Sequence, residues 1–168
     1  MALSSSPSRP FTDSYLLAYS EEHVSYEVQM FFTMIEIGVK GRVTLGGAPE
    51  ITPTLSNALL ESIVIHLRNL IDFLYPKNPQ LTDIVASDFF DPDQWESLRT
   101  ALTDTLSAAR VRANKEMAHL TTDRIFGIPP EKRWDFVGLA TELRMVLQIF
   151  VKNAKQSRLS PNVALQIL

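Results

Sequence analysis

The sequence predicts an all-α protein, an antiparallel four-helix bundle with extra short helices. Apolar residues recur at steps of three and four along four long segments, which is the spacing that gives a helix one apolar face. Proline, glycine and capping residues separate these segments, and almost no stretch alternates in the manner of a half-buried strand. Helices that each carry one apolar face bury those faces against one another, as a bundle does.

Composition and charge narrow the class of protein. A chain of 168 residues is the usual size of one domain with a core, and 45% hydrophobic with 21% charged residues favours a globular chain over a disordered one. The net charge of -3 provides no overall positive field, so any RNA contact needs a local basic patch. The lack of cysteine excludes disulfides, thiol catalysis and cysteine-ligated zinc.

We divide the chain into three parts. Residues 1–12 are rich in serine and proline and are expected to be irregular, residues 13–158 are expected to form the helical bundle domain, and residues 159–168 form an apolar tail. The tail is expected to dock either on the body or on a second subunit. The start of the chain has no apolar run suited to a signal peptide, and no stretch approaches the roughly 20 apolar residues of a membrane span. We therefore expect a cytoplasmic protein with no membrane contact.

The first helix is predicted from Asp13 or Ser14, either of which can cap it, to about Ile37. Its apolar stripe comprises Leu16, Tyr19, Val24, Val28, Phe31 and Ile35. Glycines from Gly38 onwards predict a loop over residues 38–50, with a short hairpin near its middle as one alternative. The loop lacks the GxxxxGK[ST] order and a preceding strand, so it is not expected to hold phosphate.

The second helix is predicted to start at Thr52 and Pro53, a capping hydroxyl followed by proline at the first helical position, and to run to about Tyr75. Its inner stripe comprises Leu59, Ile63, Leu67, Leu70 and Leu74. Arg68 and Asp72 are one turn apart on its polar side, which is the spacing of an ion pair. This pair is also a candidate to line a groove from the second helix.

The third helix is predicted over about 92–120, because Asp91 and Pro92 form a helix-start signal. A helical turn and a loop before it are expected to tuck Phe89 and Phe90 onto the bundle. The apolar stripe of the third helix comprises Trp95, Leu98, Leu102, Leu106, Ala109, Ala113, Met117 and Leu120. This regular spacing predicts one unbroken helix packed against its neighbours.

The fourth helix is predicted over about 131–156, after a turn that contains Gly127, Pro129 and Pro130. Its buried residues are expected to be Phe136, Leu139, Leu143, Val146, Phe150 and Val151. Ser160 and Pro161 end it.

The candidate functional residues lie late in the third helix, where Arg112 and His119 are seven residues apart. Seven residues is nearly two helical turns, about 10 Å along the axis, so both side chains are expected on nearly the same side. Glu116 lies between them, one turn from each. Measured from the centre of the stripe at Ala109, all three fall on the shoulder between core and solvent.

An arginine, six residues and a histidine late in a helix of an all-α chain resemble the motif of the HEPN superfamily. The sequence RANKEMAHLTTDR is similar to the abortive-infection-related branch, and HLRNLIDFLY in the second helix resembles such proteins without an assigned role. The resemblance covers about residues 54–155. It implies a small helical bundle, often a homodimer, and a metal-independent endoribonuclease of the toxin–antitoxin or phage-defence type. Nuclease members often have a polar residue after the arginine, whereas Ala113 follows Arg112 here.

The chemistry that this resemblance implies needs two groups. Histidine can move a proton of the 2′-hydroxyl or of the leaving oxygen near neutral pH, so His119 is the candidate general acid or base. Arg112 would bind the phosphate, with Lys115, Asn114 and Glu116 as supporting residues. A symmetric dimer would bring two such pairs to one cleft. We expect no cofactor and no metal, and the expected partners are a second copy, RNA and an antitoxin-type protein.

Three alternatives stay open. Arg112 and Glu116 form an ordinary one-turn pair, and the helix dipole favours His119 near a helix end, so the pattern can be purely structural. The same bundle can act without catalysis as a binding or interaction module. A metal site is the third alternative, because Glu116 and His119 have the spacing of a ligand pair and His23, His66 and His119 are on three different helices.

Overall fold

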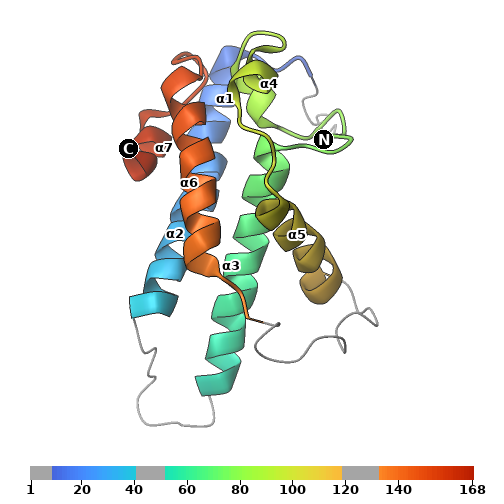
Figure 1. Ribbon diagram of the computed structural model, residues 1–168. Coiled ribbons are helices and arrows are strands. Elements are labelled where there is room, and N and C mark those ends of the chain that lie inside the picture. The colour runs from blue at the N-terminus through green and yellow to red at the C-terminus, as the bar shows by residue number, and fades with distance from the viewer. Residues whose placement is uncertain (1–8, 41–51, 119–132) are drawn as a thin grey trace, which may run out of the picture.

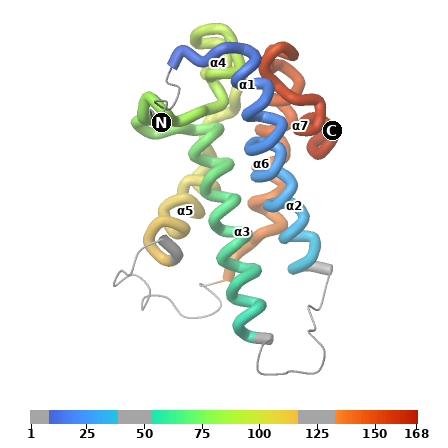
Figure 2. The backbone as a smooth tube through the Cα atoms, turned by 180° about the vertical axis from the view of Figure 1, so that it is seen from behind, coloured from blue at the N-terminus to red at the C-terminus, as the bar shows by residue number. Residues whose placement is uncertain are grey.

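The computed structural model describes residues 9–40, 52–118 and 133–168, and every regular element within these ranges is helical. The all-α class is therefore confirmed. The longest described helices, α2 (Ser25–Lys40), α3 (Thr52–Leu74) and α6 (Phe136–Asn153), run side by side (Figures 1 and 2). None of the described helices is both long enough and apolar enough to cross a lipid bilayer.

The first predicted helix forms as a continuous helical run with a π-helical turn inside it. The run consists of α1 (Asp13–Tyr19), the π-turn η1 (Ser20–Val24) and α2. Its cap is Thr12, whose hydroxyl accepts a hydrogen bond from the backbone N–H of Tyr15 at 3.2 Å. The run continues past Gly38 to Lys40, although we predicted that the loop begins at Gly38. The predicted hairpin in that loop lies outside the described residues.

The second predicted helix is confirmed as α3, which ends one residue before the predicted end. Most of its predicted stripe is buried: Ile63, Leu67, Leu70 and Leu74 are buried, and Leu59 is partly buried. The last carbonyl of α3, on Leu74, accepts hydrogen bonds from Trp95 Nε1 at 2.9 Å and Arg99 Nη1 at 3.0 Å. These side chains satisfy a backbone group that the helix end leaves without a partner.

The prediction of one continuous third helix is wrong. The structure instead has a short helix α4 (Gln94–Leu98), a non-helical link, then α5 (Asp104–Arg112) and a π-helical run η3 (Ala113–Ala118). Thr103 caps α5 by accepting a hydrogen bond from the N–H of Leu106 at 3.2 Å. Leu98, placed in the buried stripe by its spacing, is 37% exposed. The chain therefore does not form the four unbroken helices that the sequence predicted.

An aromatic cluster packs around α4 and the segment before it. Phe89 and Phe90, at the end of the short 3-10 helix η2 (Ala86–Phe89), are buried against the body as predicted. Phe90 stacks on Trp95 with ring centroids 5.2 Å apart, and Trp95 packs edge-on against Phe150 of α6 at 5.8 Å. A fully buried Trp95, hydrogen-bonded to α3, anchors α4 in the core. After α4, the chain is non-helical until α5 begins.

The fourth predicted helix forms as α6, which is shorter than expected at both ends. Residues 131 and 132 of the predicted helix lie outside the described residues. Asp135 caps α6 by accepting a hydrogen bond from the N–H of Gly138 at 2.9 Å. Its core positions are as predicted: Leu139, Leu143, Val146 and Phe150 are buried, and Phe136 and Val151 are partly buried.

The apolar tail folds back on the body as helix α7 (Pro161–Ile167), with Val163 and Ile167 buried. It packs against α6, α2 and η1, so the structure realises the first of the two docking alternatives. Ser160 donates its backbone N–H to the Ser20 hydroxyl at 2.8 Å, and both serines are buried.

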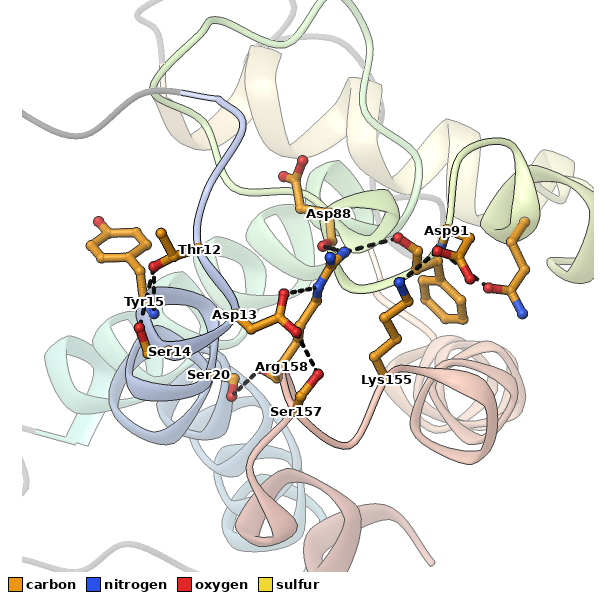
Figure 3. A network of polar contacts seen from close by, with 12 residues as sticks. Thr12, Asp13, Ser14, Tyr15, Ser20, Asp88, Asp91, Lys155, Ser157 and Arg158 are labelled. Carbon is orange, nitrogen blue, oxygen red and sulfur yellow. Dashed lines mark hydrogen bonds and ion pairs between the residues drawn. The ribbon is translucent and has the colours of Figure 1, made fainter.

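A polar network holds the segment before α7 in place (Figure 3). The Arg158 guanidinium donates to the Asp13 carboxylate at 2.7 Å and to the backbone carbonyls of Asp88 and Phe90, both at 2.9 Å. Lys155 pairs with Asp91 at 2.5 Å. One arginine thereby joins α1, the turn around η2 and the C-terminal segment.

Candidate functional site

Arg112 and Glu116 lie on the shoulder of the helical run from α5 to η3, as predicted. Ala109 and Ala113 on the inner side are buried, while the side chains of Arg112 and Glu116 are 22% and 27% exposed. Of the supporting candidates, Asn114 is half-buried and Lys115 is exposed. The structure therefore brings Arg112 and Glu116 together at the edge of the core.

The Arg112 guanidinium is engaged on several sides. Its Nε lies 2.9 Å from each carboxylate oxygen of Glu116, and its Nη1 donates to the carbonyl of Arg133 at 3.0 Å. The guanidinium carbon lies 4.2 Å from the ring centroid of Trp134, a cation–π contact. Trp134 in turn stacks on Phe136, at 5.7 Å between centroids and 1° between planes. These contacts connect the end of α5 to the start of α6.

His119 lies outside the described residues, so the predicted Arg112–His119 pair stays a prediction. The structure does change one premise of that prediction. The angle of 100° per residue belongs to an α-helix, whereas residues 113–118 form a π-helical run whose hydrogen bonds span five residues. The same-face placement of His119 therefore does not follow from its spacing alone.

Arg68 and Asp72 form the predicted ion pair at 3.6 Å, and a third residue joins them. Arg110 of α5 places its Nη1 3.6 Å from the Asp72 carboxylate and 2.9 Å from the carbonyl of Tyr75. Arg110 and Arg112 emerge about 200° apart on an α-helix. The Arg68–Asp72 pair therefore contacts a different flank of α5 from the one that carries Arg112.

A groove that sequence reasoning missed lies between the first helical run, the C-terminal part of α3 and the segment that follows it. Its volume is about 520 Å³. The residues that line it are Tyr19, His23, Val24, Glu27, Asn69, Leu70, Asp72, Phe73, Pro76, Lys77, Pro79, Thr82, Asp83, Ile84 and Val85. The groove combines an apolar floor with several ionisable side chains, as ligand sites commonly do.

Glu27 of α2 is held in this groove by two residues of α3. His66 Nδ1 lies 2.7 Å from one carboxylate oxygen, and Asn69 Nδ2 donates to both oxygens at 3.2 Å. His66 is only 8% exposed, and the ring of Tyr26 packs edge-on against it at 5.6 Å. The only sequence signal was the HLRNL stretch, which places His66 and Asn69 one turn apart. Glu27 is distant in the sequence, so nothing in that stretch identified it as the partner.

The surroundings of the Tyr19 hydroxyl in this groove disfavour its ionised form. The pKa of the half-buried Tyr19 hydroxyl is raised, chiefly by burial and further by Tyr15, Glu27 and Asp83. The hydroxyl thus stays neutral over the physiological range.

The histidines do not assemble a metal centre in the part of the chain that the structure describes. His23 stacks on Tyr19 at 4.6 Å, while His66 bonds to Glu27. Within residues 9–40, 52–118 and 133–168, no group of three or more His, Cys, Asp or Glu side chains is arranged to hold a metal ion. The three-histidine and Glu116–His119 alternatives both depend on His119, outside those residues.

Comparison of the chain with protein-family models, curated proteins and solved structures finds no match. The chain is an all-α protein in which a half-buried arginine, Arg112, joins two helical segments and a polar groove lies elsewhere on the surface.

Proposed function

We propose that this chain is a HEPN-like helical protein that acts as a non-catalytic binding or interaction module. The observation that carries this proposal is the state of Arg112, whose guanidinium contacts Glu116, the Arg133 carbonyl and the Trp134 ring. A phosphate-binding arginine needs its donors directed at the substrate. Arg112 directs Nε and Nη1 at its own protein.

Recruiting Nε or Nη1 of Arg112 to RNA would require these contacts to break. Hydrogen bonds to charged groups contribute about 1.5–3 kcal/mol each, and a partly desolvated cation–π contact about 1–2 kcal/mol. Glu116 adds a second obstacle, because a carboxylate beside the arginine repels an incoming phosphate. Ala113 after Arg112 supplies no polar group to compensate.

The second candidate function is a metal-independent endoribonuclease of the toxin–antitoxin or phage-defence type. It is favoured by the position of Arg112 on the shoulder, 22% exposed, seven residues before His119. In this candidate, Arg112 binds phosphate, His119 transfers the proton, and a homodimer brings two pairs together. An antitoxin-type protein would then be the natural partner.

Incubating cellular RNA with the protein in the presence of a chelator separates the two candidates. The variants are Arg112→Ala and His119→Ala, with Glu61→Gln on the exposed side of α3 as the matched control. The binding module predicts no RNA cleavage by any of these proteins, and a lower melting temperature for Arg112→Ala. Cleavage by the parent protein and the Glu61→Gln control, abolished in both site variants at unchanged folding, would establish the nuclease and overturn the proposal.

A further inference from the structure

The groove beside Glu27 combines apolar residues of α3 and of the segment after it with carboxylates. Leu70 is buried and Phe73 partly buried at its floor, and Ile84 and Val85 close it from the segment after α3. A volume of about 520 Å³ lies within the range of sites for small organic ligands, about 300–1,000 Å³. The partly buried Phe73 and Ile84 can therefore contact an apolar body of moderate size.

The Glu27 carboxylate is held in a defined orientation at the wall of this groove. A carboxylate has about four acceptor positions. His66 occupies one and Asn69 two, at 2.7 Å and 3.2 Å. One acceptor position remains for a further donor. Such preorganisation lowers the cost of binding a donor.

The charge balance of the groove is negative. Glu27, Asp72 and Asp83 line it, against Lys77 as the formally positive residue among the described lining residues. Asp72 is compensated by Arg68 and Arg110 from outside the groove. With histidine counted as neutral, Glu27 and Asp83 then give two negative charges against the single positive charge of Lys77. The raised pKa of Tyr19 has both carboxylates among its causes, which is consistent with a negative potential at this wall.

We propose that the groove binds a small organic cation, a protonated amine on an apolar body. The ammonium group donates to Glu27, with Asp83 in the same lining, and the body lies on Phe73 and Ile84, which are only partly buried. This inference rests on the proposed function, because it names the ligand class of a binding module. The same chemistry occurs in a free amine and in the side chain of a basic residue on a peptide.

The test measures binding by isothermal titration calorimetry with three probes. Phenethylamine is the cationic probe, phenylacetate is an anion with a similar apolar body, and a short lysine-containing peptide represents the peptide source. We expect phenethylamine or the lysine peptide to bind and phenylacetate to bind at least tenfold more weakly. The better of the two cationic probes identifies the source. Equal binding of phenylacetate, or no binding of either cation, would overturn the proposal.

Three variants and one control test the assignment of residues. Glu27→Gln and Asp83→Asn should each weaken cation binding about tenfold or more, whereas Lys77→Gln should tighten it, because it removes a positive charge from the lining. Glu61→Gln, on α3 but outside the groove, should leave binding unchanged. Asp83→Asn and Lys77→Gln keep the test decisive if the loss of the Glu27 charge impairs folding. Unchanged affinity in both of them would contradict the assignment.

Failure of this inference and failure of the proposed function look different. RNA cleavage that depends on Arg112 and His119 would remove the non-catalytic role, yet phenethylamine binding would persist. Absence of cation binding would remove this ligand class, yet leave the RNA result unchanged.

Discussion

Arg112 illustrates how a residue with apparent functional chemistry can have a structural role. Its side chain joins the end of α5 to Trp134 and the backbone of Arg133, just before α6. Glu116 fixes the orientation of the guanidinium from one turn away. The pair is partly shielded from solvent, so its contribution should exceed that of a fully exposed pair.

Glu116→Gln tests this role directly. We expect the free energy of unfolding to fall by about 1 kcal/mol, because the charge-assisted bond to Arg112 is lost while the shape is kept. Chemical denaturation of Glu116→Gln and of the Glu61→Gln control provides the measurement. If Glu116 instead only neutralised a phosphate-binding arginine, the variant would keep its stability and gain affinity for RNA.

His66 is the second residue whose importance comes from its partner. It is buried and bonded to Glu27, so His66→Ala removes a donor from a carboxylate and leaves a cavity. We expect a loss of about 2 kcal/mol in the free energy of unfolding. His23→Ala is the matched control, since the His23 side chain is 54% exposed, and it should change stability by less than about 0.5 kcal/mol. Equal effects of both substitutions in urea denaturation would show that the Glu27 bond contributes little.

At the scale of elements, the break between α4 and α5 is the main departure from the predicted bundle. Trp95 anchors α4 before this break and Thr103 caps α5 after it, and the Thr103 hydroxyl also contacts Glu142 of α6 at 2.5 Å. A single long helix would instead have placed Thr103 in a helix interior, where threonine is unfavourable relative to alanine.

Thr103→Ala therefore has opposite expected signs for the two arrangements. With the break, the substitution removes the cap of α5 and should destabilise the protein by about 1 kcal/mol. With an unbroken helix, it would be neutral or slightly stabilising. Thermal unfolding of Thr103→Ala beside Thr105→Ala, an exposed position inside α5, distinguishes these outcomes.

At the scale of the molecule, polar and ionic contacts join the start of α1 to the segment before α7. Asp13, at the start of α1, receives hydrogen bonds from Ser157 at 2.6 Å and Arg158 at 2.7 Å (Figure 3). The pKa of the Asp13 carboxyl is lowered, chiefly by the hydrogen bonds from Ser157 and Arg158, against a smaller opposing effect of desolvation. The segment that leads into α7 is thereby tied to the first helix.

This lowered pKa makes the stabilisation from the Asp13 contacts depend on pH. Since the folded-state pKa lies below the unfolded-state value, Asp13 contributes its stabilisation fully above about pH 4 and loses it as the pH falls through the folded pKa. We expect Asp13→Asn to reduce the difference in melting temperature between pH 6 and pH 3. Melting curves at both pH values for the parent, Asp13→Asn and Asp104→Asn provide the measurement. A reduction as large in Asp104→Asn, at the start of α5, would show that the effect is not specific to this network.

Local patterns were sufficient for much of the fold. The stripes of the first, second and fourth helices were assigned correctly, because burial of one helix face imposes a period that the residues themselves display. The same period misled at Leu98, whose spacing fits the stripe although the chain leaves the helix after it. The spacing of apolar residues carries no information about the hydrogen bond from Trp95 to the end of α3.

The sequence by itself determined the all-α class, the extent of α3 and the one-turn pairs Arg68–Asp72 and Arg112–Glu116, since these depend on residues close together in the chain. Only the tertiary structure decided what those residues contact across the molecule. The Trp134 contact of Arg112 and the Glu27–His66 bond each join separate helical segments. Such contacts arise when helices pack, and the order of residues along a helix specifies its own apolar face but not which polar side chain a neighbouring helix will bring to it.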